Sequence, residues 1–290
     1  MEKKKGILFI AAAAVLMSTG GLLIKSVQAS AMTVALARAF FAALVFCPFM
    51  QWKKIRFSRH LVGLVISYVY LTFAFVTATK MTTAANAIIL QCTAPLWLYL
   101  GYIITGKKKI VLGECAPRLV ILAGILVILF DPANASGDAT KMIGNLLALS
   151  AGISYAAEQY FLEQQFPMSD VTVVGILNIS MALVIVLLMG SQISFAQVTP
   201  LGWGFLVFLG VFQIGISYVL FRKGVVAVSA FEASILSLLE PILNPILVFF
   251  FLGEAPSLYT IIGFAVILGG IVMTLLPGRA GKETPSQNRC

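Results

Sequence analysis

The sequence predicts an all-α integral membrane protein of ten transmembrane helices, built as two inverted five-helix repeats. Three observations support this prediction: the composition is too apolar for a water-soluble domain, ten segments have the length of a membrane span, and the second half repeats the first. Hydrophobic residues make up 60% of the 290 residues and charged residues 11%, with a mean hydropathy of +1.00. Because a soluble domain has about a quarter of its residues charged, we expect lipid as the surrounding medium.

Each of the ten apolar segments is close to the length that crosses a hydrocarbon core as a helix, about 20 residues. A lipid-exposed chain must satisfy its backbone hydrogen bonds internally, which favours helices. The predicted spans are 6–26, 30–50, 61–79, 83–105, 116–132, 142–162, 170–189, 201–221, 228–252 and 257–277. Several connections are very short, so consecutive helices are expected to be antiparallel neighbours.

The first segment also has features of a secretory signal peptide. Glu2-Lys3-Lys4-Lys5 is a charged start, and Ala29-Ser30-Ala31 resembles a cleavage site. We prefer the interpretation as a first membrane span, because the apolar run is long and nine further spans would have an odd topology after cleavage.

The internal repeat is clearest in the fifth and tenth spans. Val120-Ile121-Leu122-Ala123-Gly124-Ile125 returns 146 residues later as Val266-Ile267-Leu268-Gly269-Gly270-Ile271, and Pro95 returns at the same spacing as Pro241. Two helices and their connection therefore share one origin. In a chain this apolar, a long internal repeat is typical of a transporter built from two related halves.

The earlier helices of the two halves match more weakly. Gly6-Ile7-Leu8-Phe9 resembles Gly144-Asn145-Leu146-Leu147 at a spacing of 138 residues. Five is an odd number of spans, so the second copy enters the membrane in the opposite direction. We therefore expect two domains, 1–139 with spans one to five, and 140–290 with spans six to ten and a short cytoplasmic tail.

The positive charges predict the orientation. With ten spans, 16 of the 20 Lys and Arg residues fall on one side, among them Lys3-Lys4-Lys5 and Lys107-Lys108-Lys109, whereas Lys25, Lys80 and Lys141 fall on the other. The positive-inside rule places the basic side, with both termini, in the cytoplasm. The expected location is a bacterial-type cytoplasmic (inner) membrane, crossed many times.

The same distribution of charge argues against nucleic-acid binding, despite the net charge of +9. Cys47, Cys92, Cys115 and Cys290 have no paired spacing, which predicts neither disulfides nor a metal site. The sequence has no GxxxxGK[ST] run for nucleotide phosphates, and no cofactor is expected. His60 is the single histidine and lies at the edge of a span, so no enzyme activity is expected.

Several local patterns have a family resemblance. They are Ala37-Arg38-Ala39-Phe40 in the second span, the segment 233–241 in the ninth, and Phe251-Leu252-Gly253-Glu254 before the tenth. With the five-plus-five repeat, they make residues 6–277 resemble the drug/metabolite transporter superfamily, specifically its EamA-like family. The first half departs from the pattern, because Gly106-Lys107-Lys108 stands where the glutamate is expected. The resemblance implies a ten-helix carrier that moves small metabolites, often outward, by alternating access and without ATP.

Charged residues inside a bilayer are costly unless paired or hydrated, which makes them candidate functional residues. Glu240 lies near the middle of the ninth span, and Pro241 frees the carbonyl of Ser237 one turn back. Ser237, Glu240 and Asn244 are predicted to share one helical face. A polar face beside a broken helix suits a substrate site; the alternative is a structural glutamate that satisfies the kinked backbone.

Three other charged residues are candidates for transport. Arg38 can bind a carboxylate or a phosphate with its fork of donors, or it can hold Glu240 or backbone carbonyls as a fixed structural ion. Glu158, in the sixth span and on the face of Tyr155, is a candidate carrier of a coupling proton. Glu232, near the cytoplasmic end of the ninth helix, is either a gate or a solvated helix end.

Amide and aromatic side chains complete the predicted lining of a cavity of mixed polarity, suited to amphipathic metabolites such as amino acids. Each of them alone is more often a packing or helix–helix hydrogen-bonding residue. The set comprises Asn86 (the repeat counterpart of Glu232), Gln91, Trp97, Tyr155, Gln213 and Tyr218, with Tyr68, Tyr70 and Asn178 as further members.

The predicted function is secondary-active transport of small metabolites, first of all amino acids or related compounds, with export favoured. Uptake or exchange is the alternative, and a non-transporting membrane scaffold is a remote one. The expected partners are a small-molecule substrate and the lipid bilayer, with a proton gradient as a candidate energy source. The sequence leaves open the substrate, the direction, the coupling ion and the oligomeric state.

Overall fold

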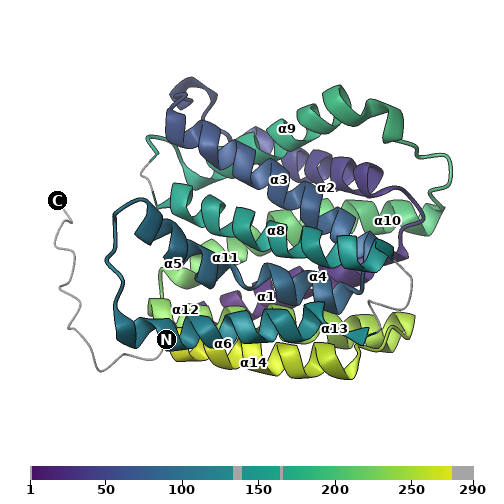
Figure 1. Cartoon of the computed structure of the whole chain (residues 1–290). Coiled ribbons are helices and arrows are strands. Elements are labelled where there is room, and N and C mark those ends of the chain that lie inside the picture. Colours follow the sequence, from purple (N-terminus) through teal and green to yellow (C-terminus); the bar gives the residue numbers. More distant parts are fainter. Residues whose placement is uncertain (1, 133–138, 164–165, 276–290) are drawn as a thin grey trace.

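A computed structural model describes residues 2–132, 139–163 and 166–275, which form helices joined by turns, with no β-strand among them (Figure 1). The helices of the first half are α1 (Glu2–Ser26), α2 (Ala31–Phe46), α3 (Arg59–Met81), α4 (Ala84–Gln91), α5 (Ala94–Ile104) and α6 (Leu112–Leu129). Those of the second half are α8 (Ala139–Leu162), α9 (Asp170–Met189), α10 (Pro200–Phe208), the π-helical η4 (Leu209–Ile216), α11 (Ser217–Val225), α12 (Ala230–Ser237), α13 (Leu239–Leu252) and α14 (Leu258–Leu275).

The predicted fold class is confirmed. Within the described residues, eight of the ten predicted segments form helices long and apolar enough to cross a membrane. The other two, 116–132 and 142–162, also form helices, α6 and α8. The protein is therefore an all-α, multi-pass membrane protein, and the count of ten crossings stays a prediction.

Successive predicted spans run in opposite directions, so the bundle has two ends. The end at which α1, α3 and α9 begin, at the left of Figure 1, carries Lys3, Arg59, Lys107 and Arg222. We call it the basic end, and we call the other the opposite end.

Serine and threonine side chains cap many of the helix starts. Each accepts a hydrogen bond from the backbone N–H three residues later, which satisfies one of the N–H groups that a helix start leaves unpaired. The capping residues are Ser30, Ser58, Thr83, Ser169, Thr199 and Ser229. The short connections between helices therefore have local signals in the sequence.

Two long helices are interrupted at equivalent positions of the repeat. Cys92 ends α4 with φ −67° and ψ −2°, and Leu238, 146 residues later, ends α12 with φ −66° and ψ −12°. Pro95 and Pro241 follow at the same distance, and a proline has no N–H for the carbonyl one turn back. The sequence predicted the break at Pro241 but not the one at Pro95; the predicted span 83–105 is a candidate membrane span over Ala84–Ile104.

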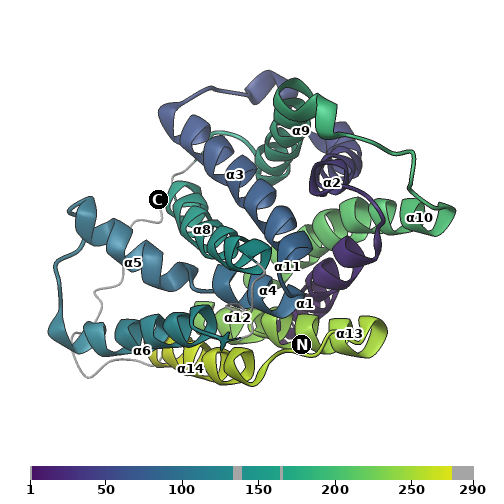
Figure 2. The same cartoon turned by 45° about the vertical axis from the view of Figure 1, so that its right-hand side comes forward.

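The packing of the helices follows a two-fold relationship between the halves. The helix α8 packs on α3, α4 and α5, and its counterpart α1 packs on α11 and α13. Two further pairs bring counterparts together, α2 with α9 and α6 with α14, and both views show α6 and α14 side by side (Figures 1 and 2). This arrangement is the one expected of two inverted five-helix repeats.

The repeated segment found in the sequence forms the contact between α6 and α14. A Cβ atom placed on Gly124 would lie 2.6 Å from Cγ1 of Ile267, and one on Gly270 would lie 2.6 Å from Cγ1 of Ile121. Each glycine therefore packs against the isoleucine of the other repeat. Small residues that let backbones approach closely are the usual basis of helix packing in lipid.

The weaker match between α1 and α8 also has a structural equivalent. A Cβ atom on Gly6 would meet Ala227 and Val228, and one on Gly144 would meet Met81 and Thr82. The two sets of partners are 146 residues apart, so Gly6 and Gly144 occupy equivalent positions at the two ends of the bundle.

The π-helical segment η4 between α10 and α11 was not predicted. At its start, Gly210 lies against α2, where a Cβ atom would be 2.8 Å from the carbonyl oxygen of Arg38. Further along, η4 directs the side chain of Gln213 toward Arg38. Such segments are frequent at functional sites.

Candidate functional site

Arg38 is buried in the middle of α2, with 8% of its surface exposed. Its Nη2 donates a hydrogen bond to Oε1 of Gln213 at 3.1 Å, and Nε2 of Gln213 donates to the carbonyl of Met17 in α1 at 3.5 Å. Gln213 therefore fixes the guanidinium between α1, α2 and η4. The Nε of Arg38 is buried and has no hydrogen-bond partner among the described residues.

A second hydrogen-bonded pair joins the corresponding helices of the other half. The hydroxyl of Tyr68 in α3 donates to Oδ1 of Asn178 in α9 at 2.9 Å. One pair joins the second span to the eighth, and the other joins the seventh to the third, as the two-fold relationship requires. Corresponding helices are thus joined once through a charged side chain and once through neutral ones, at neighbouring rather than identical positions of the repeat.

Two carboxylates and a tyrosine surround these pairs. Glu240 in α13 interacts electrostatically with Arg38 and with Tyr155 of α8, and Glu158 of α8 interacts with Tyr155 and Tyr68. Glu158 is 8% exposed, and Glu240 is partly exposed. The structure thus brings together candidates that the sequence places on separate spans. We call this group the central cluster: Arg38, Tyr68, Tyr155, Glu158, Asn178, Gln213 and Glu240.

The predicted polar face of the ninth span needs a correction. The proline-induced break leaves Ser237 at the end of α12 and Glu240 in the first turn of α13, so the two residues do not share one continuous helical face with Asn244. The hydroxyl of Ser237 donates to the carbonyl of Ala233 at 2.9 Å. Asn244 is 1% exposed and packs against Gly21 of α1.

Three other predicted residues lie in helices next to the central cluster. Gln91 is in the last turn of α4, and its Oε1 is buried without a hydrogen-bond partner among the described residues. Trp97 in α5 donates from Nε1 to the hydroxyl of Thr93 at 3.0 Å. Tyr218 in α11 packs edge-on against Phe46, with 5.8 Å between ring centroids, on the basic-end side of η4.

Asn86 lies away from the central cluster, in a buried network at the opposite end. Its Nδ2 donates to Oδ1 of Asn145 in α8 at 3.1 Å, and its Oδ1 accepts from the hydroxyl of Thr260 in α14 at 2.7 Å. Thr82, at the end of α3, donates to the same oxygen of Asn145 at 2.7 Å. The start of α4 is therefore held by two other helices.

Glu254, just after α13, also holds the start of α4. One of its oxygens accepts the backbone N–H of Ala84 at 2.7 Å, and the other pairs with Lys25 of α1. A pocket of about 170 Å³ lies at this end, and its lining includes Asp131 and Lys141. We call the group that holds α4 the opposite-end network: Lys25, Thr82, Ala84, Asn86, Asn145, Glu254 and Thr260.

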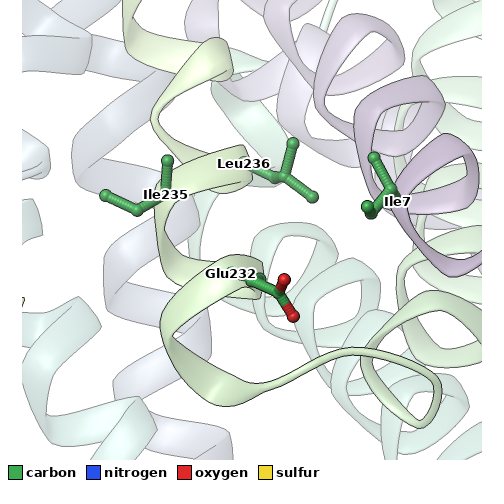
Figure 3. Close-up of a pocket in the computed structure, with 4 residues that line it drawn as sticks. All are labelled: Ile7, Glu232, Ile235 and Leu236. Carbon is green, nitrogen blue, oxygen red and sulfur yellow. The ribbon is translucent and has the colours of Figure 1, made fainter. Parts of the chain in front are cut away.

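Glu232 lies at the basic end, at the start of α12. Its carboxylate accepts from the backbone N–H and the hydroxyl of Ser229, each at 3.0 Å, and pairs with Lys3 at 2.6 Å. Beside it a pocket of about 200 Å³ lies between α12 and α1, which are also in contact. This pocket is lined by Ile7, Glu232, Ile235 and Leu236 (Figure 3).

The two ends differ, although the halves correspond. Asn86 begins α4 and Glu232 begins α12, at equivalent positions of the repeat. The helix α4 packs on α1, α13 and α14, whereas α12 has no comparable packing on α8, α5 or α6 within the described residues. The bundle is therefore closed around α4 at the opposite end and looser around α12 at the basic end.

Sequence reasoning missed the closing role of Asn145, Thr260 and Glu254. Asn145 belongs to the repeated segment after Gly144, and Glu254 belongs to the junction pattern before the tenth span. These residues belong to patterns that are visible in the sequence, but the patterns do not indicate which helix each residue contacts. Their partners lie on other spans, which only the folded chain brings near.

The EamA-like transporter family matches this chain over residues 4–130 and 142–276. An uncharacterized transporter of Archaeoglobus fulgidus is 26% identical over 267 residues, covering 91% of this chain and 94% of that protein. The uncharacterized transporter YwfM of Bacillus subtilis is 31% identical over 211 residues, or 69% of this chain and 67% of that protein. A biotin transporter of Escherichia coli K12 is 27% identical over 202 residues, or 67% of each chain.

A solved crystal structure has the same fold. It superimposes with a TM-score of 0.65 over 96% of this chain and 99% of that chain, at 19% sequence identity. At this identity the likeness concerns the fold alone.

Proposed function

Because this chain belongs to the EamA-like transporter family, we propose that it is a secondary-active transporter that moves small metabolites by alternating access. The observation that supports this mechanism best is the unequal state of two equivalent helix tips. A pocket lies beside each tip, but the tip of α4 is held by the opposite-end network, whereas α12 has no comparable packing on α8, α5 or α6 within the described residues. If the halves exchange these states, the central cluster faces each side in turn.

The helix caps support a mobile α12 tip. Ser229 and Glu232 form a capping box, so the start of α12 satisfies its N–H groups with its own residues. The start of α4 instead uses Glu254 from another helix for the N–H of Ala84. The α12 tip can therefore change neighbours without losing a cap, whereas the α4 tip must give up a hydrogen bond.

The proposed orientation puts the basic end and both termini in the cytoplasm of a bacterial-type cell. The positive charges at this end support it, since positive loops stay on the cytoplasmic side. The proposed domains are 1–139 and 140–290, supported by the two segments that match the family and by the two-fold packing. In this proposed orientation, the end that is looser around α12 would face the cytoplasm.

The proposed substrates are amino acids or related compounds, and the proposed direction is export. The central cluster supports a substrate with both polar and charged groups, because it contains a buried cation, two carboxylates and two tyrosines. Since one relative is named a biotin transporter, biotin is a second candidate, and its uptake is the alternative direction.

A proton gradient is the proposed source of energy. Glu158 and Glu240 support it, because they are the two carboxylates of the central cluster and each lies near Tyr155. A carboxylate that changes its protonation as the cluster changes sides would link proton movement to substrate movement.

The test of transport is flux in proteoliposomes loaded with a mixed pool of amino acids and vitamins, with and without a proton gradient. We expect one compound class to leave, and to leave faster when the gradient is imposed. Protein-free liposomes are the control for leakage. Equal loss of every compound from both preparations would contradict transport, and a flux indifferent to the gradient would contradict proton coupling.

The test of alternating access is a reversible lock at the opposite end. Cysteines at positions 86 and 260 replace a hydrogen-bonded pair, 2.7 Å apart, in a variant whose native cysteines are serines. We expect a short bis-methanethiosulfonate, which forms a disulfide with each cysteine and releases two sulfinates, to stop the flux, and a reductant to restore it. Each single-cysteine variant is the control. Full flux in the cross-linked double variant would contradict the mechanism.

A further inference from the structure

The charge of Arg38 has no anionic partner in the folded chain. Among the described residues it forms no ion pair within 4.0 Å, and its one hydrogen bond goes to the neutral oxygen of Gln213. Its Nε has no partner, although the side chain is more than nine-tenths buried. A buried charge without a partner is strongly destabilising, so such a group calls for an explanation.

The packing of the helices does not require this charge. In the other half, α9 and α3, which correspond to α2 and η4, are joined by a hydrogen bond between the neutral side chains of Asn178 and Tyr68. Since a neutral pair is sufficient in one half, the positive charge in the other half is available for another purpose.

The geometry of the guanidinium selects the shape of an anion. Nη2 donates one of its two N–H groups to Gln213, and Nε, which shares the side edge of the guanidinium with Nη2, has no partner among the described residues. An arginine edge matches the two oxygens of a carboxylate in a bidentate pair. Arg38 is also the one cationic side chain of the central cluster, which matches a single negative charge better than the double charge of a phosphate.

Glu240 defines the other end of the site. It interacts electrostatically with Arg38, and no ion pair within 4.0 Å joins the two side chains among the described residues. A molecule with an anionic and a cationic group can satisfy both. A carboxylate alone would satisfy only Arg38.

We propose that Arg38 binds the carboxylate of the transported molecule through its Nε edge, with the substrate's amino group toward Glu240. This inference rests on the proposed transport function and specifies which group of the substrate is read. Gln213 acts as the positioning residue, because it orients the guanidinium without neutralising it. A compound without a carboxylate leaves the buried charge unsatisfied and is rejected.

The first test measures binding without transport. Purified protein in detergent is heated with each of the 20 common L-amino acids and with their α-amides, which keep the amino group but carry no carboxylate. We expect at least one amino acid to raise the melting temperature, and its amide to bind at least about tenfold more weakly. Equal shifts by acid and amide, or a shift by neither set, would overturn the proposal.

The second test uses two variants of Arg38 and one matched control. Arg38→Lys keeps the charge and loses the fork, so we expect the half-saturation concentration to rise at least about tenfold, while Arg38→Gln abolishes binding. Ser154→Ala, which removes a buried hydrogen bond from α8 to the carbonyl of Ser67 in α3 and lies outside the central cluster, reports any loss of folding from this type of contact. Unchanged affinity in Arg38→Lys would contradict bidentate binding.

Flux measurements distinguish a failure of carboxylate recognition from a failure of the transport function. If the wild-type protein moves amino acids and their amides at equal rates, carboxylate recognition is wrong and transport stands. If amino acids stabilise the protein in an Arg38-dependent manner but no compound crosses the membrane, the binding site stands and the transport function is wrong.

Discussion

The side-chain oxygen of Gln213 accepts a hydrogen bond from Nη2 of Arg38 across the boundary between the two halves of the chain. The acceptor is neutral, so the guanidinium is oriented and keeps its charge. Gln213→Glu makes the acceptor an anion of nearly the same shape. We expect an internal ion pair that competes with the substrate and raises the half-saturation concentration at least about tenfold, or about 1.4 kcal/mol.

The measurement for Gln213→Glu is concentration-dependent uptake of the identified substrate into proteoliposomes. Gln213→Met is the matched variant, since it keeps the length of the side chain and removes the acceptor. Its effect on affinity should be smaller, because Arg38 stays charged. If Gln213→Met lowers the affinity for substrate more than Gln213→Glu does, competition for the guanidinium is not the cause of the lower affinity.

Glu240→Gln should reduce transport and leave membrane insertion intact. The change removes the charge in the first turn of α13 without changing the shape of the side chain, so the helix and its packing on α1 persist. Flux is measured at several pH values between about 5.5 and 8, where a carboxyl group with a perturbed pKa can change its protonation. Glu2→Gln, at the exposed start of α1, is the control. Wild-type flux in Glu240→Gln would remove Glu240 from the site.

Glu254→Gln should shift the protein toward the state open at the opposite end. The neutral amide loses the ion pair with Lys25 and accepts more weakly from the N–H of Ala84. Loss of a helix cap costs about 1 kcal/mol, enough for about a fivefold change in population. We would measure the reaction of a cysteine at position 87, which is fully buried, with an impermeant maleimide.

The control for Glu254→Gln is Glu114→Gln, which weakens an ion pair with Lys108 at the basic end. Both variants are made in a chain whose native cysteines are serines. Labelling at position 87 should accelerate in Glu254→Gln alone. Equal rates in both variants would mean that Glu254 does not hold the α4 tip.

Two adjacent glycines of α14 should differ sharply in their tolerance of substitution. A Cβ at position 270 would lie 2.6 Å from the side chain of Ile121 and 3.0 Å from its backbone nitrogen, whereas one at position 269 would meet nothing within 4 Å. We expect Gly270→Ala to destabilise the protein by about 1–3 kcal/mol, the usual cost of overpacking. Thermal unfolding in detergent checks this, with Gly269→Ala as the matched control, expected to be neutral.

The sequence predicted those features of the fold that depend on composition and on proline. All ten apolar segments became helices because lipid leaves the backbone no other partner, and the ninth span broke at the place that Pro241 indicates. The break at Pro95 was not predicted, although Pro95 holds the same position in the first copy of the repeat as Pro241 holds in the second. The argument made for Pro241, that a proline leaves the carbonyl one turn back without a donor, applies to Pro95 as well.

The central cluster could be predicted only in part. Arg38, Glu158 and Glu240 stand out because they are charged residues inside apolar segments. Their neighbours do not stand out: η4 has no local signal, and it directs Gln213 toward Arg38 only because α2 approaches Gly210. The opposite-end network likewise joins common polar residues from α3, α4, α8 and α14, whose meeting depends on the packing of the whole bundle.

The pairing of α6 with α14 has a consequence for how the cell must make this protein. Synthesis reaches Leu129 at the end of α6 roughly 130 residues before Leu258 begins α14, which at about 5–20 residues per second is roughly 7 to 26 seconds. During that time the glycine face around Gly124 has no partner. The first half therefore leaves the ribosome unfinished, and folding can conclude only after the last span enters the membrane.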